Sequence, residues 1–451
     1  MTRLRRGDFG EDFTWGVAHA SYQVEGAWNA EGKGPSIWDA FTHGGGRIQD
    51  GSNGDVACDF YHRYPEDLDL VRAMGFDAQR FSISWPRVLP TGRGAVNRAG
   101  IDFYSRVVDA CLERGIEPWV TLYHWDLPQA LQERGGWRNR DIVGWFADYA
   151  SVVADALGDR VRRWMVFNEP TSFLLGGYLG GVHAPGVRSL NGFLEASHHV
   201  ALSQASGSAA IRAAAPGADV GTTHIFTPPD MAGDTARHRR AARAFDAVVN
   251  RMHLEPSLGL GYPVEAAGVL RRIERYQRPG DDDAVLVDWD FLGVQYYQRL
   301  AVHPAPIPGL GFVPRPRRDH TRFDITAMGW EVDPTGLREV LDQFHAYGKV
   351  DRLYVTENGA AYPDAVDGDR VHDPRRIGYY DAHLAQVLAA KQEGVPVHGY
   401  FCWSYCDNFE WSFGLRPRFG LVHVDYTTQR RRVKDSGYWF SALLGGDLTE
   451  E

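Results

Sequence analysis

The stretch Leu353-Tyr354-Val355-Thr356-Glu357-Asn358-Gly359 sets the pattern from which the fold of this chain is inferred. Its first four residues are apolar, aromatic or β-branched, which is typical of a short buried strand. The carboxylate of Glu357 ends that strand, and Asn358-Gly359 predicts a turn directly after it. Because burying an unpaired carboxylate is costly, Glu357 must meet a partner, a metal or a substrate. For one acid alone, an ion pair that only stabilises the strand end is the simpler interpretation.

A second stretch has the same design: Arg163-Trp164-Met165-Val166-Phe167, followed by Asn168-Glu169-Pro170. Pro170 cannot donate to a sheet, so the predicted strand ends there. Glu169 and Glu357 therefore both end apolar strands, 188 positions apart in the chain (357 minus 169). In a parallel barrel the C-terminal ends of all strands meet at one face, where catalytic groups collect. Two carboxylates at such a face are what cleavage of a glycosidic bond requires.

Strand-like and helix-like segments alternate along the rest of the chain. Strand patterns occur at residues 13–18, 79–85, 117–122, 219–226, 291–297 and 398–404, and helical spacing occurs at 59–74, 101–114 and 194–214. No linker, low-complexity run or internal repeat divides the 451 residues. We therefore predict the α/β class, with a single (β/α)8 TIM barrel over residues 1–451 and extended loops at its C-terminal face.

Composition excludes several classes of function. The net charge of −10 argues against nucleic-acid binding, and no run approaches the roughly 18 apolar residues of a membrane-spanning helix. The basic run Arg3-Leu4-Arg5-Arg6 is not followed by the apolar segment of a secretory signal. The four cysteines are sparse for this length, which favours free thiols in a reducing compartment. We expect a cytoplasmic protein that binds neither nucleic acid nor a membrane; the sequence leaves open whether it forms a homo-oligomer.

Asn168-Glu169-Pro170 and Thr356-Glu357-Asn358-Gly359 resemble the two active-site signatures of glycoside hydrolase family 1, the retaining β-glucosidases and their relatives. The resemblance extends from about Phe13 to about Tyr438. It implies an exo-β-glycosidase that hydrolyses terminal non-phosphorylated β-D-glucosyl residues by double displacement. In that mechanism Glu357 would be the nucleophile and Glu169 the acid/base, and the partner would be a small-molecule β-glycoside.

The resemblance further implies two residues that act on the nucleophile. Arg80 would keep Glu357 ionised and lower its pKa, and Tyr297 would donate a hydrogen bond to it. The family needs no metal or organic cofactor. The residues themselves also argue against zinc, since no second histidine follows His124 at i+4 and no HExxH motif occurs.

The same resemblance assigns residues to the sugar. Gln23 would contact hydroxyls 3 and 4, His124 hydroxyls 3 and 6, and Asn168 the 2-hydroxyl. Trp403 would lie under the ring, and Glu410 would hold hydroxyls 4 and 6. A carboxylate at that position would repel a phosphate, so Glu410 argues against 6-phosphoglycosides. The remaining residues assigned to substrate binding are Trp125, Gln295, Trp330, Trp411 and Phe419.

Two positions depart from the family pattern. Thr171 follows Asn-Glu-Pro where many members carry Trp, and Gln295 stands where members usually carry Asn. These departures motivate an alternative: a glycosidase or transglycosidase specialised for a particular glycosylated metabolite. A non-catalytic sugar-binding homologue is the other alternative. The Pro-, Gly- and Arg-rich residues 303–320 are predicted to form a long loop at the rim of the site.

Overall fold

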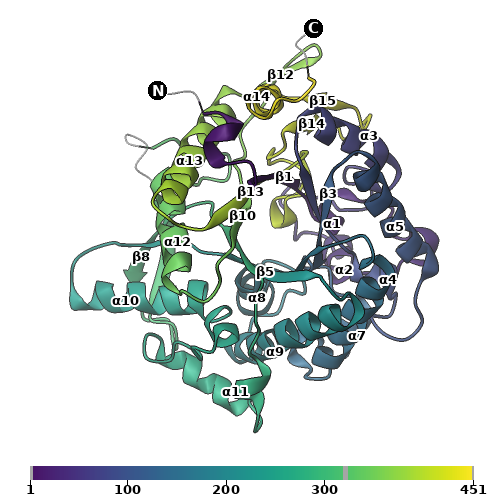
Figure 1. Cartoon of the computed structure of the whole chain (residues 1–451). Coiled ribbons are helices and arrows are strands. Elements are labelled where there is room, and N and C mark those ends of the chain that lie inside the picture. The colour runs from purple at the N-terminus through teal and green to yellow at the C-terminus, as the bar shows by residue number, and fades with distance from the viewer. Residues whose placement is uncertain (1–3, 318–322, 449–451) are drawn as a thin grey trace.

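The computed structural model describes residues 4–317 and 323–448, and its centre is a closed barrel of parallel strands (Figure 1). The barrel strands are β1 (Thr14–Ala18), β2 (Ala78–Ser82), β3 (Glu117–Tyr123), β4 (Arg163–Asn168), β5 (Asp219–Ile225), β7 (Phe291–Gln295), β10 (Leu353–Asn358) and β13 (Val397–Trp403). Their order is β1-β13-β10-β7-β5-β4-β3-β2, so each pairs with the next in the chain and β13 closes against β1. The predicted (β/α)8 barrel is confirmed.

Helices surround the barrel, as Figure 1 shows. The longer ones are α3 (Phe60–Ala73), α5 (Arg98–Glu113), α7 (Ile142–Leu157), α9 (Leu190–Ala214), α10 (Ala236–Asp246), α12 (Pro334–Ala346), α13 (Pro374–Gln392) and α14 (Asp435–Leu444). The shorter ones are α1 (Ser21–Val24), α2 (Ile37–His43), α4 (Trp85–Val88), α6 (Gln129–Gln132), α8 (Pro170–Leu174) and α11 (Asp281–Ala284). Short 3₁₀ or π segments are η1 (Arg6–Phe9), η2 (Ala30–Gly32), η3 (Gly136–Arg138), η4 (Leu175–Gly180), η5 (Ala247–Arg251), η6 (Glu255–Leu258), η7 (Gly268–Arg275) and η8 (Trp411–Phe413). The helices predicted at 59–74, 101–114 and 194–214 correspond to α3, α5 and α9.

Aromatic side chains fill the interior of the barrel. The ring centroid of Trp119 lies 4.8 Å from those of Tyr354 and Phe401, and 5.5 Å from that of Phe291. A Cβ on Gly16 would lie 2.2 Å from the Phe401 ring, so only glycine leaves room for it. The barrel is therefore a packed core, and a substrate can enter only from its end.

Two predicted strands end two or three residues earlier than expected. The strand predicted at 79–85 ends at Ser82, because Trp85 already begins the short helix α4. The strand predicted at 291–297 ends at Gln295. Tyr297 consequently lies on the loop after β7, yet its hydroxyl still reaches Glu357.

The segment predicted as a loop at 303–320 contains strands in its described part, and its predicted place at the rim of the site stays a prediction. β8 (Leu300–Pro304) and β9 (Phe312–Pro316) form an antiparallel hairpin, and β8 also pairs with β6 (Pro229–Met231). This small sheet packs against α10. Residues 318–320 of the predicted loop lie outside the described residues. Two further small sheets are formed by β11 (Ala365–Asp367) with β12 (Arg370–His372), and by β14 (Val422–Val424) with β15 (Arg431–Val433).

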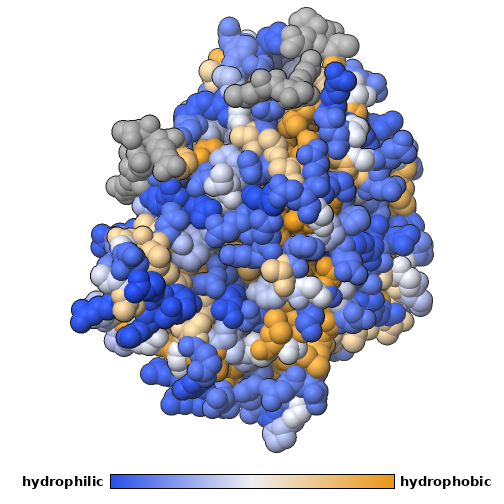
Figure 2. Space-filling view, turned by 60° about the vertical axis from the view of Figure 1, so that its left-hand side comes forward, coloured by the Kyte–Doolittle hydropathy of each residue, from blue (hydrophilic) through white to orange (hydrophobic). Residues whose placement is uncertain are grey.

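The visible face in Figure 2 is mostly hydrophilic, with hydrophobic residues in scattered groups. Within the described ranges, every helix is too short or too polar to span a lipid bilayer. The four cysteines Cys58, Cys111, Cys402 and Cys406 are buried and unpaired, as predicted.

Candidate active site

A cavity of about 340 Å³ opens at the C-terminal ends of the barrel strands. Eleven of the residues predicted for the site line it: His124, Trp125, Asn168, Glu169, Tyr297, Trp330, Glu357, Trp403, Glu410, Trp411 and Phe419. They come from the ends of β3, β4, β10 and β13 and from the loops that follow the strands. The parallel barrel thus brings together residues that are up to about 300 positions apart in the chain.

The two carboxylates face this cavity from different backbone settings. Glu357 is the penultimate residue of β10 and is 3% exposed, and Glu169, just after β4, is 5% exposed. Glu169 adopts a left-handed backbone conformation (φ 43°), which is uncommon outside glycine. It precedes Pro170, which starts α8. The strand end and the helix start together fix the direction of the acid.

Both oxygens of Glu357 are held by buried donors. The guanidinium of Arg80 donates from Nη1 to Glu357 Oε1 at 2.6 Å, and the hydroxyl of Tyr297 donates to Oε2 at 2.8 Å. Arg80 Nη1 also donates to the Thr356 carbonyl at 3.1 Å. These contacts match the predicted relationship of Arg80 and Tyr297 to the nucleophile position.

The surroundings give the two acids different affinities for a proton. Burial raises the pKa of Glu357, while the charge of Arg80 and the bonds from Arg80 and Tyr297 lower it; the net direction is upward. Arg80 therefore lowers this pKa as predicted, but burial outweighs the guanidinium and leaves the pKa above its ordinary value. Burial and the negative charge of Glu357 raise the pKa of Glu169 well above its ordinary value. The proton shared by the pair therefore belongs on Glu169.

Asn168 is fixed by three neighbours. Its Oδ1 accepts from Arg80 Nη2 at 2.6 Å and from Gln295 Nε2 at 2.9 Å, and its Nδ2 donates to His124 Nε2 at 2.9 Å. Because His124 Nε2 accepts, the ring proton is on Nδ1, which has no partner within the described chain. Burial and the charge of Arg80 hold the pKa of His124 well below its ordinary value, so the ring is neutral. Asn168 thus keeps one side-chain N–H, and His124 keeps Nδ1–H, without a partner within the described chain.

Three predicted residues do not line the cavity itself: Arg80, Gln295 and Gln23. The amide nitrogen of Gln23 is occupied, since it donates to Asn408 Oδ1 at 3.1 Å and to the Phe409 carbonyl at 2.9 Å. Of the two polar atoms of the Gln23 amide, Oε1 is the one without a partner within the described residues. The contact of Gln23 with hydroxyls 3 and 4 stays a prediction, and the amide oxygen is the atom that could accept from them.

Aromatic rings form one wall of the cavity. The ring of Trp125 lies 4.4 Å from that of Trp411, and the ring of His124 lies 5.8 Å from that of Trp403. The indole N–H of Trp125 donates to the Asn168 carbonyl, so this residue can offer a sugar only its ring face. Trp330, Tyr297 and Phe419 pack against one another on another side.

Glu410 is the third acid of the cavity. Its Oε2 has no partner within the described chain, and burial together with the charge of Glu357 raises its pKa to about 8. Glu410 therefore carries little negative charge near neutral pH in the free protein, which weakens the repulsion expected toward a 6-phosphate. The cavity lining nevertheless contains no lysine or arginine that would pair with a phosphate.

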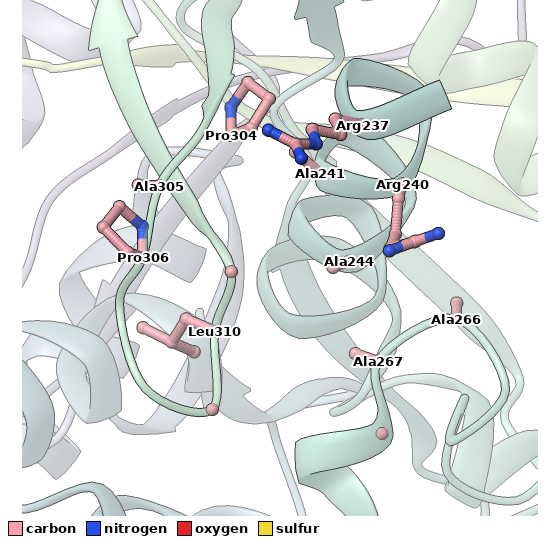
Figure 3. Close-up of a pocket in the computed structure, with 13 residues that line it drawn as sticks. Arg237, Arg240, Ala241, Ala244, Ala266, Ala267, Pro304, Ala305, Pro306 and Leu310 are labelled. Carbon is pink, nitrogen blue, oxygen red and sulfur yellow. The ribbon is translucent and has the colours of Figure 1, made fainter. Parts of the chain in front are cut away.

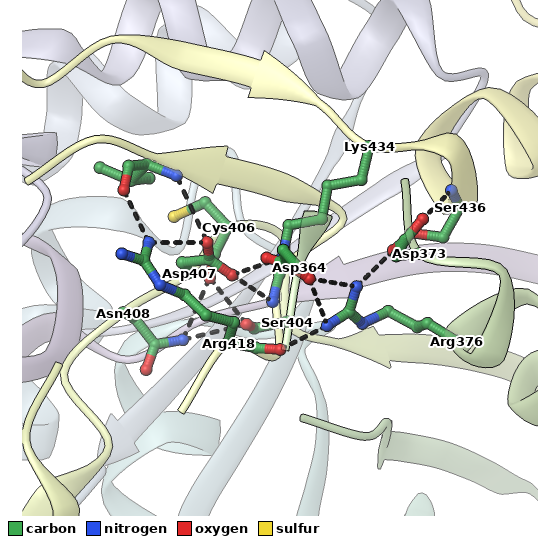
Figure 4. Close-up of polar contacts among 12 residues, drawn as sticks. Asp364, Asp373, Arg376, Ser404, Cys406, Asp407, Asn408, Arg418, Lys434 and Ser436 are labelled. Atoms are coloured by element: carbon green, nitrogen blue, oxygen red, sulfur yellow. Dashed lines mark hydrogen bonds and ion pairs between the residues drawn. The ribbon is translucent and has the colours of Figure 1, made fainter. Parts of the chain in front are cut away.

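A buried charge network supports the loop that carries Glu410 (Figure 4). Lys434 Nζ lies 2.7 Å from both Asp407 Oδ1 and Asp364 Oδ2, and Arg418 Nη1 donates to Asp407 Oδ2 at 2.9 Å. Arg376 pairs with Asp364 from the other side. Burial opposes ionisation, but Lys434 and Arg418 hold the pKa of Asp407 below its ordinary value.

Two carboxylates of this network also belong to a cluster of residues that could hold a metal ion. Asp364, Asp407 and His423 have ligand atoms close enough to hold an ion. However, three basic side chains, those of Lys434, Arg418 and Arg376, already neutralise the two carboxylates. The cluster is therefore structural, and it positions the Asp407–Trp411 segment.

Sequence reasoning missed several lining residues: Ser172, His183, Ile225, Met328 and Phe413. Ser172, His183 and Phe413 lie next to recognised motifs, which is the one feature that could have found them. Thr171, the unusual residue after Pro170, faces away from the cavity; its Oγ1 lies 2.9 Å from His253 Nδ1. His253 Nε2 in turn lies 3.1 Å from Ser197 Oγ.

Comparison with known proteins agrees with this geometry. The family model for glycosyl hydrolase family 1 matches residues 5–446. Beta-glucosidase A of Thermotoga maritima is 42% identical over 98% of this chain and 99% of that protein, and its structure superposes with a TM-score of 0.92. A bifunctional beta-D-glucosidase/beta-D-fucosidase of Bifidobacterium breve is 42% identical over 97% of this chain and 98% of its own length. The Thermotoga enzyme has also been solved in complex with glucoimidazole (TM-score 0.92, 42% identity, 98% of this chain and 99% of that one). The chain belongs to glycosyl hydrolase family 1.

Proposed function

We propose that the chain is a retaining exo-β-glucosidase that releases terminal, non-phosphorylated β-D-glucosyl residues. The observation that carries this proposal is the pair of buried acids in one cavity, only one of which is bonded to a guanidinium and a tyrosine hydroxyl. That asymmetry supports Glu357 as the ionised nucleophile and Glu169 as the protonated acid.

In the first step Glu357 attacks the anomeric carbon, and Glu169 gives its proton to the leaving oxygen. The charge of Glu357 disappears when the glycosyl ester forms. Since that charge raises the pKa of Glu169, its loss allows Glu169 to ionise and to deprotonate the incoming water. Water then attacks the same carbon and releases glucose with its β configuration retained.

The sugar would be held by groups that the protein leaves without partners. These are the Nδ1–H of His124, the remaining N–H of Asn168, Gln23 Oε1 and Glu410 Oε2, with Trp403 as the platform. A phosphorylated sugar is disfavoured, because the cavity lining contains no lysine or arginine that would pair with a phosphate.

The test is incubation with 4-nitrophenyl β-D-glucoside, with the anomer of the released glucose followed by proton NMR. We expect nitrophenol release and β-glucose as the first product. Release of α-glucose would contradict the retaining mechanism, and no release would favour the non-catalytic homologue.

A broader sugar range is a second candidate, because the Bifidobacterium breve relative is named for both glucosidase and fucosidase activity. A panel of nitrophenyl β-glucoside, β-fucoside and β-galactoside, with product masses recorded, also tests the specialised transglycosidase alternative. Cytoplasmic localisation stays a prediction, supported by the unpaired cysteines.

A further inference from the structure

A second cavity, of about 500 Å³, adjoins the catalytic cavity across a shared wall. Its lining residues are Phe41, Gly46, Arg47, Gln49, Gly181, Val182, Gly186, Arg188 and Ser412. Two chain segments divide the cavities: Val182 and Ser412 face the second cavity, whereas the next residues, His183 and Phe413, face the catalytic one. Ser412 Oγ donates to the Val182 carbonyl, which fastens the two segments together.

The dividing wall lies at the mouth of the catalytic cavity. His183 and Phe413 are partly exposed, and Val182 is 56% exposed, whereas Asn168 and Glu357 are buried. Because the barrel interior is packed, the leaving group of a bound glycoside must point toward this mouth. A long leaving group would therefore extend toward the wall that Val182, His183, Ser412 and Phe413 form.

Two arginines of the second cavity have no anionic partner. Arg47 and Arg188 are exposed, and no carboxylate of residues 4–317 or 323–448 pairs with either. Asp50, the nearest acid to Arg47 in sequence, is engaged with Ser52 and with the backbone N–H of Leu415. The cavity therefore offers two unneutralised guanidinium groups on a chain whose net charge is −10.

Glycines allow both arginines to lie against the wall segment. A Cβ on Gly186 would lie 2.7 Å from Arg47 Nη1, and a Cβ on Gly181 would lie 2.6 Å from Arg188 Cγ. Both glycines also have positive φ values, 85° and 67°, that other residues rarely adopt. Arg47 Cζ lies 4.7 Å from the centroid of the Phe41 ring, a cation–π contact that holds the guanidinium against the cavity wall.

We propose that this cavity binds a carboxylate carried by the leaving group, so that the enzyme prefers β-glucosides of aromatic acids. Guanidinium groups match carboxylates in a two-point geometry, and the exposed side chain of Val182 would contact the aromatic part. The proposal rests on the glucosidase function above and deepens it, since it concerns the leaving group rather than the sugar.

A groove elsewhere on the surface provides a matched control (Figure 3). It has a volume of about 480 Å³ and lies between α10 and the β8–β9 hairpin, with Arg237 and Arg240 at its edge. Neither arginine has a carboxylate partner in the described chain. This groove shares no lining residue with the catalytic cavity.

The experiment compares kcat/KM for the β-D-glucoside of 4-hydroxycinnamic acid with that for the β-D-glucoside of its primary amide. The two differ in the charge of the far end. We expect the natural sequence to have a higher kcat/KM for the acid than for the amide. In the double variant Arg47→Gln/Arg188→Gln, the acid-to-amide ratio of kcat/KM should be about tenfold lower. The preference should also weaken between about 0.02 and 0.5 M NaCl, because screening shortens the range of the attraction. Arg237→Gln/Arg240→Gln should keep the ratio.

Calorimetric binding of free 4-hydroxycinnamate separates this proposal from the glucosidase proposal, because it needs no turnover. The acid should bind the natural protein more tightly than the Arg47→Gln/Arg188→Gln variant. Absence of an acid preference, or a preference that survives in that variant, would overturn the proposal. An equal loss in the Arg237→Gln/Arg240→Gln control would do the same. If 4-nitrophenyl β-D-glucoside is not cleaved, the glucosidase function fails, and the binding comparison still decides the role of the arginines.

Discussion

Nη1 of Arg80 lies 2.6 Å from Oε1 of Glu357, and Nη2 of the same guanidinium lies 2.6 Å from Oδ1 of Asn168. One buried arginine therefore fixes the proposed nucleophile and the proposed ligand of the 2-hydroxyl relative to each other. The charge that this arginine supplies competes with the cost of burial, and that competition decides how easily Glu357 ionises.

Removal of the guanidinium should change the pH dependence of activity. Arg80 lowers the pKa of Glu357, so Arg80→Gln should raise that pKa and move the acid limb of the kcat/KM profile to higher pH. Arg80→Lys keeps a positive charge and should move the limb less. An acid limb that stays in place in Arg80→Gln would show that Glu357 does not govern it.

The two acids should respond differently to truncation. Glu357→Ala should abolish turnover of every β-glucoside, because no nucleophile is left to form the glycosyl-enzyme. Glu169→Ala should cost about 10² to 10⁴-fold with alkyl glucosides but little in the first step with nitrophenyl glucosides, whose leaving groups need no proton. Equal losses on both substrates would contradict the acid role of Glu169.

Gln295 should affect activity by positioning the side chain of Asn168. Its Nε2 is one of two donors to Asn168 Oδ1, and the shorter side chain of Gln295→Asn would not keep that 2.9 Å bond without movement of the strand. We expect kcat/KM for 4-nitrophenyl β-D-glucoside to fall roughly tenfold, the value of one hydrogen bond of about 1–1.5 kcal/mol. The loss should shrink with the 2-deoxy substrate, which lacks the hydroxyl proposed to bind Asn168. An equal loss on both substrates would refute this route.

Thr171 should matter for stability more than for chemistry. Thr171→Val keeps the shape but leaves the buried Nδ1 of His253 without its partner, at a cost of about 1–3 kcal/mol in the free energy of unfolding. Thr171→Ser retains the hydroxyl and is the control. Chemical denaturation measures both, and equal stabilities for the two variants would show that the bond contributes nothing.

Asp407 should stabilise the fold with a defined pH dependence. Asp407→Asn leaves Lys434 with less compensation in a buried site and should cost about 3–5 kcal/mol, whereas the exposed Asp369→Asn should cost little. The pKa of Asp407 in the folded protein is below the ordinary value of 3.8. The stability that the ionised carboxylate contributes is therefore complete above pH 3.8, and it is lost as the pH falls through the folded-state pKa. Unfolding curves at pH 7 and at about pH 3 measure this. The difference in the free energy of unfolding between the natural protein and Asp407→Asn should be smaller at the lower pH.

The sequence alone determined the barrel and the place of the two acids, because strand-end carboxylates and apolar strand patterns are local features that a parallel barrel gathers at one face. Most other lining residues were identified through the resemblance of sequence motifs to family 1. It did not reveal that residues 303–320 contain a β-hairpin, since their Pro and Gly content suggests a loop and only pairing with β6 and packing on α10 make them strands. Tertiary structure also decided which atoms of the Gln23 amide are hydrogen-bonded within the protein. It likewise decided that the pKa of Glu357 shifts upward. Both depend on neighbours far away in the chain and on the depth of burial, which no short stretch of sequence records.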